Sequence, residues 1–315
     1  MRTPRPGHLF RALLALALLL SASDAAFAQL TIADQFDPSG TSDNCGLGFD
    51  SAAHEVWLYG CSGATVQRYS TAGVLLPSTV ARPGESANDV DVELATAPFT
   101  LGATVLPANA LLFINGETGP AEIYALDKST GAVLSTLNTA FGASHVVGGA
   151  YHRIRASLFL VQDKVAGVTN GNRVAEISPI TGSILNTFQI ASTFSVNFGD
   201  LEVCNATGHL IAVSSDENRI AEYTPTGTLV QYFPLPVGIS ELAGIGIDES
   251  SGDLWVASSA GGGDVWRLTG GPCAPTPVPS LSGHAQLVLA GMLVAAGLAL
   301  PSLRARLMGE RRRSA

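Results

Sequence analysis

The sequence predicts an all-β protein, a five-bladed β-propeller closed by its N-terminal strand, and three observations carry that prediction. First, short apolar runs alternate with turn residues, as in the stretch 199–236, which contains four predicted strands and three turns. Second, this pattern recurs at intervals of about 40 to 50 residues. Third, one such meander cannot bury both faces of its sheet, so copies must pack on one another around an axis.

The repeat is clearest in the second strand of each unit and in the turn that precedes the fourth. The predicted second strands are 55–59, 110–114, 157–161, 209–213 and 253–257. The turns contain glycines 73, 131, 182, 227 and 270, which are 58, 51, 45 and 43 residues apart. Glycine accepts the positive φ that tight hairpins require. The body therefore has five units, with an insertion in the second between Leu94 and Pro107.

Closure of the ring is expected to involve the mature N-terminus. The fifth unit ends near Gly271, directly after its third strand and turn, so its outermost strand is missing. Residues 29–38 have a residue pattern similar to that of the predicted fourth strand 228–236. We therefore expect residues 29–38 to supply the missing outermost strand of the fifth unit. This pairing would remove an exposed sheet edge. The alternatives are an open arc of five units and a six-bladed ring with one degenerate blade.

Both ends of the chain have the composition of targeting segments. Residues 1–28 contain arginines, the apolar run 12–20 and Ala26-Phe27-Ala28, which is the order of a secretory signal peptide. The alternative is an uncleaved anchor, although the run is shorter than the about 20 residues that span a bilayer. The propeller should occupy 29–273, followed by a proline-rich linker at 274–284. A transmembrane helix is predicted at 285–303 and a basic cytoplasmic tail at 304–315.

The linker carries a recognisable motif. Val278, Pro279, Ser280 and Leu281, followed by one helix and an arginine cluster, resemble the IPTL-type C-terminal sorting domains of bacterial envelope proteins. Gly283 and His284 depart from the acidic and tryptophan residues of that family. The resemblance implies export machinery and a sorting protease as partners, and a location at the cell envelope or outer surface, membrane-anchored until the helix is processed. A plain tail anchor is the alternative.

Charge and cysteine content narrow the classes of partner. Between residues 29 and 273 the chain has 9 Lys plus Arg and 24 Asp plus Glu, so this body carries 9 − 24 = −15. Such an acidic body should repel nucleic acid and anionic lipid. Four cysteines in an exported body favour disulfides and allow three pairings. A hairpin centred on Ala53 would place Phe49 opposite Trp57 and Cys45 opposite Cys61, which leaves Cys204 to pair with Cys273.

A second resemblance concerns the repeats themselves. Asp200-Leu201-Glu202, Thr207-Gly208 and Ser215-Asp216-Glu217 are similar to blade motifs of the NHL, SdiA-regulated and phytase-like propellers, with Val203 in place of the usual glycine. This resemblance implies a fold only, because the fold serves enzymes and binding proteins alike.

Candidate site residues gather where the predicted innermost strands begin, around the channel mouth. The predicted ligand-binding residues are Asn44, Asp89, His145, Asp200 and Glu241. Their carboxylate, amide and imidazole groups make calcium a candidate cofactor. The alternative is that these side chains only cap turns, which is the ordinary use of Asn and Asp. The other histidines considered, His54, His152 and His209, are expected at the surface.

A second candidate site lies on one predicted strand. Period-two alternation places Asp89, Asp91 and Glu93 on one face, where like charges repel unless a metal or solvent screens them. They are therefore candidate metal ligands. The alternative is a strand whose face carrying these residues is exposed to solvent.

Two functions follow from these observations. The first is a non-catalytic exported propeller that binds an extracytoplasmic protein or a small ligand; a purely structural matrix protein is a variant of it. The second is a calcium-dependent hydrolase of the phytase or lactonase kind. The first is favoured because no nucleophile motif is present and the arginines are scattered among loops.

Overall fold

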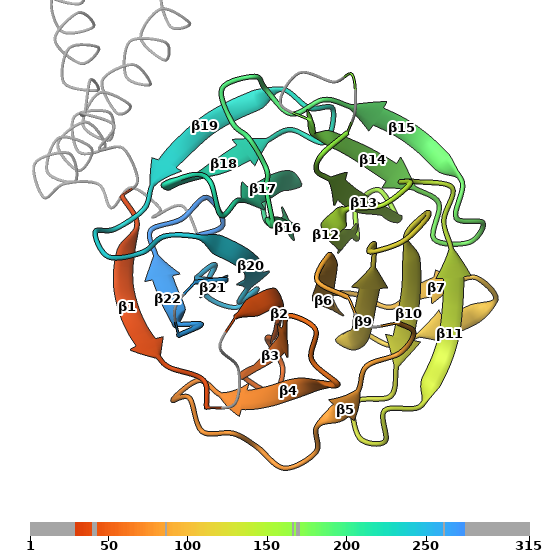
Figure 1. Ribbon diagram of the computed structural model, residues 1–315, viewed down its shortest axis with the longest axis horizontal. Helices are drawn as coiled ribbons and strands as arrows, with labels where there is room; N and C mark the ends of the chain where they lie inside the picture. Colours follow the sequence, from red (N-terminus) through yellow and green to blue (C-terminus); the bar gives the residue numbers. More distant parts are fainter. Residues whose placement is uncertain are drawn as a thin grey trace, which may run out of the picture. The chain divides into compact units, whose positions relative to one another are not determined.

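The computed structural model describes residues 29–39, 43–85, 87–165, 167, 171–260 and 262–274. These residues form five four-stranded antiparallel sheets arranged as blades around a central axis (Figure 1). The predicted five-bladed propeller is confirmed, and the open arc and the six-bladed ring are wrong. Within these described ranges, no helix has the length and apolar character needed to cross a membrane. The predicted signal peptide, and every segment predicted after Ala274, lie outside the described residues.

Four blades are built from consecutive parts of the chain, and their strands run in order from the axis outward. Blade 1 contains β2 (Asn44–Asp50), β3 (Glu55–Gly60), β4 (Thr65–Ser70) and β5 (Val80–Ala81). Blade 2 contains β6 (Val90–Ala95), β9 (Ala110–Asn115), β10 (Glu122–Leu126) and β11 (Val133–Asn138). Blade 3 contains β12 (Val146–His152), β13 (Ser157–Gln162), β14 (Arg173–Ile177) and β15 (Ile184–Phe188). Blade 4 contains β16 (Asp200–Cys204), β17 (His209–Val213), β18 (Arg219–Tyr223) and β19 (Leu229–Pro234).

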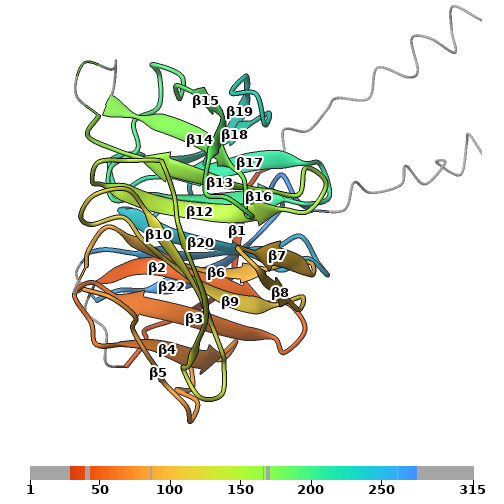
Figure 2. The same cartoon turned by 90° about the vertical axis from the view of Figure 1, so that its right-hand side faces the viewer.

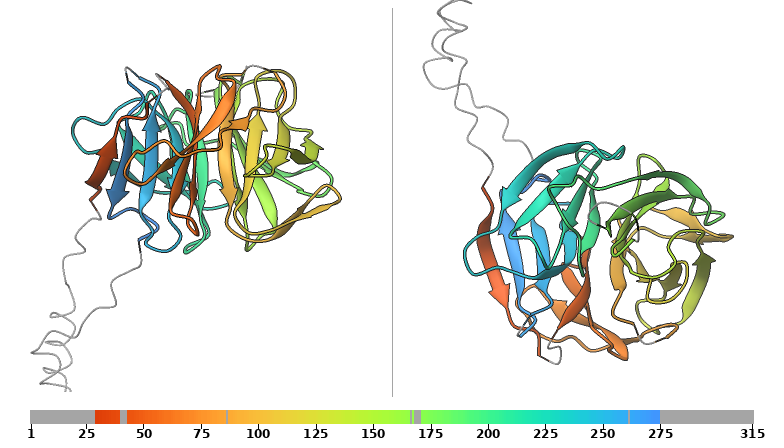
Figure 3. Two further views of the ribbon diagram at one scale, coloured as in Figure 1. Left: turned by 90° about the horizontal axis from the view of Figure 1, so that it is seen from below. Right: turned by 45° about the horizontal axis from the view of Figure 1, so that its top comes forward.

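Blade 5 joins the two ends of the described chain. It contains β20 (Leu242–Ile247), β21 (Leu254–Ser258), β22 (Val265–Thr269) and, outermost, β1 (Thr31–Phe36). Figure 3 shows β1 lying along β22 at the outside of this blade. Gln35 is paired with Trp266, and the Thr31 and Thr269 hydroxyl oxygens are 2.7 Å apart. The predicted closure by the N-terminal strand is therefore confirmed.

The apolar core is divided into layers between neighbouring blades. Five buried clusters are present among the described residues, and each joins two adjacent blades. The cluster between blades 5 and 1 contains Trp255, which stacks on Phe49 with 5.3 Å between ring centroids. Phe36 of β1 also contacts Trp255, at 6.3 Å between centroids. Packing as well as backbone pairing thus closes the ring.

The innermost strands approach one another so closely that small residues are required. A Cβ atom on Gly148 of β12 would lie 2.1 Å from an Asp200 carboxylate oxygen on β16, and one on Gly46 would lie 2.8 Å from the Asp91 Cα. Either substitution would force adjacent blades apart. The predicted turn glycines are confirmed as well, because all five have positive φ, from 69° to 87°.

The predicted register of the first hairpin is wrong by one residue. Phe49 is paired with Val56, and Gly48 is opposite Trp57. The register shifts between Asn44 and Gly46, so Cys45 lies in a bulge. The wrong register arises in the turn, which pairs Asp50 with Glu55, whereas a centre at Ala53 would pair Asp50 with Val56. Both predicted disulfides, Cys45–Cys61 and Cys204–Cys273, are nevertheless formed.

The insertion in the second unit forms a hairpin of its own. It contains β7 (Phe99–Leu101) and β8 (Thr104–Leu106), and Figure 2 shows it beside β9. Phe99 stacks on Tyr151 of blade 3, with 4.2 Å between centroids. The hairpin therefore covers apolar surface between blades 2 and 3.

The two disulfides should differ in their contribution to stability. The Cys204–Cys273 bond closes a loop with a sequence separation of 69, whereas Cys45–Cys61 has a separation of 16. Chain entropy then predicts a loss of about 4 kcal/mol for Cys204→Ala/Cys273→Ala and about 3 kcal/mol for Cys45→Ala/Cys61→Ala. Urea unfolding of both double variants measures the order. A larger loss in the second variant would contradict this account.

Candidate functional site

One backbone hydrogen bond recurs in every blade and defines the channel mouth. A residue one to three positions before each innermost strand accepts, through its carbonyl oxygen, the N–H of a residue that follows the second strand, at 2.8 to 3.0 Å. The five accepting residues are Asp43, Asp89, His145, Asn197 and Glu241. Asp89, His145 and Glu241 of the predicted site thus occupy equivalent positions. Asn44 lies one residue further along, and Asp200 lies deeper, on β16.

The backbone at the mouth is held in an uncommon conformation. His145, Phe198 and Glu241 have φ of 59°, 41° and 54°, in the left-handed region that side chains other than glycine rarely adopt. Such strain persists only where surrounding contacts hold it, and it gathers at functional positions. Sequence reasoning did not reveal Phe198 as a mouth residue.

His145 joins two buried carboxylates. Its Nδ1 atom is 2.5 Å from Asp89 Oδ2 and 3.9 Å from Asp163 Oδ1. Burial raises the pKa of the Asp89 carboxyl, and the neighbouring His145 opposes that rise. Burial also raises the pKa of the Asp163 carboxyl, and Lys164, whose Nζ is 3.8 Å from Asp163 Oδ2, opposes it. Asp163 was not predicted, because it follows a second strand in the sequence.

Several acceptor oxygens at the mouth lack a hydrogen-bond donor within the described structure. They are Asn44 Oδ1, Asp89 Oδ1 and Asp163 Oδ1, and all three are buried. A shallow hollow lies at the mouth and is lined by residues of all five blades: Cys45, Asn88, Val147, Phe198, Gly199 and Ala243. Carboxylate and amide oxygens of this kind are ligands that calcium prefers. Among the described residues, however, no three His, Cys, Asp or Glu side chains are grouped closely enough to hold a metal.

Below the mouth, two carboxyl pairs cross the axis. Asp91 and Glu93 on β6 occupy the same register positions as Asp200 and Glu202 on β16, opposite the corresponding second-strand residues. The negative charge of Asp200 contributes to the raised pKa of Asp91, and that of Glu93 contributes to the raised pKa of Glu202. Burial raises the pKa of Asp200 and that of Glu93 to about 7 each, and it raises the pKa values of Asp91 and Glu202 well above their usual range.

The predicted metal ligands Asp89, Asp91 and Glu93 do lie along one face at β6, but their side chains turn to different partners. Asp89 contacts His145, Asp91 accepts a hydrogen bond from the Gly149 amide, and Glu202 affects the pKa of Glu93. The alternative of a solvent-exposed strand face is wrong, because the three residues are only 2% to 3% exposed. Glu202 was missed as a site residue, although Asp200-Leu-Glu202 has the same spacing as Asp91-Val-Glu93.

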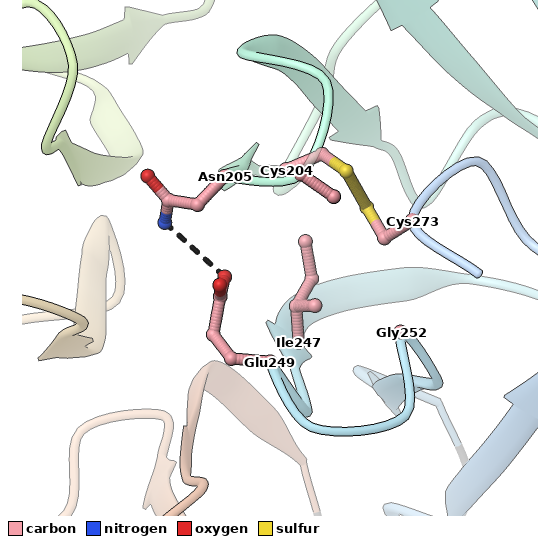
Figure 4. A pocket seen from close by; sticks show the side chains of 7 residues that line it. Cys204, Asn205, Ile247, Glu249, Gly252 and Cys273 are labelled. Carbon is pink, nitrogen blue, oxygen red and sulfur yellow. Dashed lines mark hydrogen bonds between the residues drawn. A yellow bond between two sulfur atoms is a disulfide. The ribbon is translucent and has the colours of Figure 1, made fainter. Parts of the chain in front are cut away.

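At the opposite end of the axis, Asn205 links several blades. Its Nδ2 atom donates to Thr96 Oγ1 at 2.8 Å and to Glu249 Oε1 at 3.1 Å. Its backbone carbonyl oxygen accepts a hydrogen bond from the Arg153 guanidinium. Figure 4 shows Asn205 and Glu249 beside the Cys204–Cys273 disulfide. Burial raises the pKa of Glu249. These contacts hold blades 2, 3, 4 and 5 together at this end.

The expectation that His152 lies at the surface is wrong. It is 1% exposed, its Nε2 is 3.1 Å from the Gly208 carbonyl oxygen, and its ring contacts Phe159. Burial lowers the pKa of His152. His152 is a core residue between blades 3 and 4. His54 is exposed, and His209 is partly exposed.

Comparisons with known proteins support the fold and go no further. No known family matches the sequence, and no curated protein matches it. The solved structure of the Myxococcus xanthus glutaminyl cyclase is similar, with a TM-score of 0.53, 13% identity, and 76% of this chain and 95% of that chain covered. A Xanthomonas campestris gluconolactonase has a TM-score of 0.48, 13% identity, and coverage of 78% and 92%. At 13% identity, the likeness to the glutaminyl cyclase shows a shared fold alone.

The hydrogen bond between His145 and Asp89 at the mouth should stabilise the fold. We expect His145→Asn, which tolerates the left-handed backbone, to lose about 2 kcal/mol, because Asp89 is left buried without a partner. The loss should be larger at pH 7 than at pH 4, since burial raises the pKa of Asp89 and its ionised form then lacks compensation. Urea unfolding measures both values.

A second variant provides the control for this prediction. Asp89→Asn/His145→Asn has no buried charge at this position, so its loss should depend less on pH than that of His145→Asn. Equal pH dependence in the two variants would show that the pair does not act as described.

Proposed function

We propose that this chain is an exported β-propeller that binds a small cationic ligand at its channel mouth, as a binding module. The main support for this proposal is a set of buried oxygens that lack a hydrogen-bond donor within the described structure. They are Asn44 Oδ1, Asp89 Oδ1 and Asp163 Oδ1. A buried acceptor that lacks a donor favours a ligand that supplies one or carries positive charge. The body's net charge of 9 − 24 = −15 favours the same class of ligand.

The size of the hollow limits the ligand. The hollow is too small to enclose a drug-sized molecule, whose pockets measure roughly 300 to 1,000 Å³. The buried oxygens that lack donors suit a metal cation or the ammonium group of a small amine. The ring of Phe198, which is 36% exposed, offers a further surface beside the hollow, and Lys164 Nζ lies 4.1 Å from the centre of that ring.

Export and anchoring belong to the same proposal. The charged, apolar and small-residue order of 1–28 supports secretion, and the uncharged stretch 285–303 before an arginine cluster supports a membrane anchor. The motif Val278–Leu281 supports recognition by a sorting protease at the cell envelope. The body would then face an extracytoplasmic protein or small-molecule partner.

A calcium-dependent hydrolase of the phytase or lactonase kind is the second candidate function. This second function is supported by the buried oxygens of Asn44, Asp89 and Asp163, which are the kind of ligand that calcium prefers. Calcium held there would supply a Lewis acid that lowers the pKa of a bound water. His145 beside Asp89 is the side chain placed to accept a proton at this site.

Thermal unfolding of the full-length chain in detergent tests the binding proposal. Calcium or methylammonium should raise the unfolding temperature, and Asp89→Asn and Asp163→Asn should abolish the rise. Asp34→Asn, an exposed carboxylate on β1, is the matched control and should behave like the native chain. If neither cation changes the unfolding temperature, the proposal fails. Calcium-dependent cleavage of phosphate esters or lactones by the native chain alone would favour the hydrolase.

A further inference from the structure

The ammonium group of Lys164 lies at the channel mouth in a position that a cationic ligand would take. Its Nζ atom is 4.1 Å from the centre of the Phe198 ring and 3.8 Å from Asp163 Oδ2. The face of an aromatic ring attracts a cation within about 6 Å of its centre, and a carboxylate attracts it by charge. The protein therefore already places an aromatic face and a carboxylate around one primary ammonium group.

The carboxylate and the ring are joined to each other and to the blades on either side. Asp163 directly follows β13 of blade 3, and its backbone N–H donates to the His145 carbonyl oxygen at 2.9 Å. Phe198 precedes β16 of blade 4, and its backbone N–H donates to Asp163 Oδ2 at 3.2 Å. This second hydrogen bond helps to hold Phe198 at its uncommon φ of 41°. The aromatic face and the carboxylate thus form one preorganised unit between blades 3 and 4.

The carboxylate of Asp163 keeps an acceptor that Lys164 does not use. Asp163 is 0% exposed, and its Oδ1 atom has no hydrogen-bond donor within the described structure. Lys164 Nζ approaches the other oxygen, Oδ2, at a distance longer than a direct hydrogen bond. Phe198 also lines the hollow at the mouth. A primary ammonium group that enters this hollow has three N–H donors, so it can donate to Asp163 Oδ1 while it faces the same ring.

Lys164 is held weakly enough to be displaced, whereas Asp163 is not. The Lys164 side chain is 42% exposed, so a change of side-chain rotamer alone moves its ammonium group into water. Cation–π contacts and ion pairs at exposed positions are each weak. A buried carboxylate without a nearby cation is costly, and Asp163 therefore needs a positive group in the free and in the bound protein. A cationic ligand must replace Lys164 at this position.

We propose that Lys164 is a built-in occupant of the mouth, and that the ligand carries a primary alkylammonium group that displaces it. This inference rests on the cation-binding function proposed above and names the class of ligand. In the free protein, Lys164 lies on the Phe198 ring beside Asp163. In the bound protein, the ligand ammonium takes that place and Lys164 moves into solvent. An amine regains both contacts that Lys164 gives up, whereas a hydrated metal ion regains only the contact with the carboxylate, so Lys164 favours amines over metal ions.

The composition of the chain gives this displacement a direct readout. Lys164 and Lys128 are the only lysines in the sequence of 315 residues. Full-length protein labelled with ¹³C-lysine, in a non-ionic detergent, should therefore give two sets of lysine signals in NMR spectra. The Phe198 ring should shift the Lys164 ε-methylene protons upfield, and methylammonium should return them to the position of a solvated lysine. Lys128, which pairs with Asp50, is the internal control and should not move.

Two substitutions separate the roles of the lysine and the ring. Lys164→Met keeps the apolar stem and removes the competing ammonium group, so methylammonium should bind about five-fold more tightly, and its gain should exceed that of calcium. Phe198→Leu should remove the upfield shift of Lys164 and weaken methylammonium binding about five-fold, with less effect on calcium. Val237→Ala, at a fully exposed apolar residue, is the matched control and should behave like the native chain.

Thermal unfolding measures binding in parallel, with equal concentrations of sodium chloride as the blank. Movement of the Lys164 signal together with a rise in unfolding temperature supports the proposal. A rise without that movement, or a native Lys164 signal without an upfield shift, would overturn it and leave cation binding at the mouth standing. No rise with either cation would contradict the proposed function as well. Nα-acetyl-lysine amide is a second probe: tighter binding than methylammonium supports a peptide side chain as the source of the group, and equal or weaker binding supports a free amine.

Discussion

The pairing of β1 with β22 is the interaction on which the rest of the structure depends. Without it, blade 5 has three strands and an exposed edge beside Trp266. With it, residues from the two ends of the described chain lie in one sheet, and all five clusters of apolar side chains between blades are complete. The Cys204–Cys273 disulfide reinforces the same region by tying the segment after β22 to blade 4.

Closure dictates the chemistry of the axis. Once the ring is complete, the innermost strands crowd together, and Gly46, Gly148 and Gly244 leave no room for a side chain beside their neighbours. Blades 2 and 4 instead place carboxyl groups at the corresponding levels, out of contact with water. The mouth above them keeps buried oxygens that lack hydrogen-bond donors within the described structure. The axis therefore combines an open polar end with a dehydrated acidic interior.

Much of the fold could be predicted because its signals are local. Turn glycines such as Gly182 must have positive φ, and the missing fourth strand of the last unit pointed directly to the N-terminus. The first hairpin register could not be predicted, since the side-chain pattern does not fix the length of the turn that pairs Asp50 with Glu55. His152 was misplaced because its burial results from contacts with blade 4, which are distant in sequence.

The candidate site was only partly predictable for the same physical reason. The residues before the innermost strands could be read from the repeat, and Asp89 and His145 do meet at the mouth. Their partner Asp163 follows a second strand, and the charge interactions of Asp91 with Asp200 and of Glu93 with Glu202 link blades that are not adjacent in the chain. Alternation along one strand indicates which side chains share a face, but only the closed ring determines what they face.

Ring closure can be tested directly at its outermost pair. Thr31 and Thr269 lie opposite each other, with hydroxyl oxygens 2.7 Å apart, so Thr31→Cys/Thr269→Cys should form an intramolecular disulfide on oxidation. Mass spectrometry of alkylated protein should then show three disulfides and no free thiol, and the oxidised variant should unfold at a higher urea concentration than the native chain. Two free thiols at positions 31 and 269 in the folded protein would contradict the account.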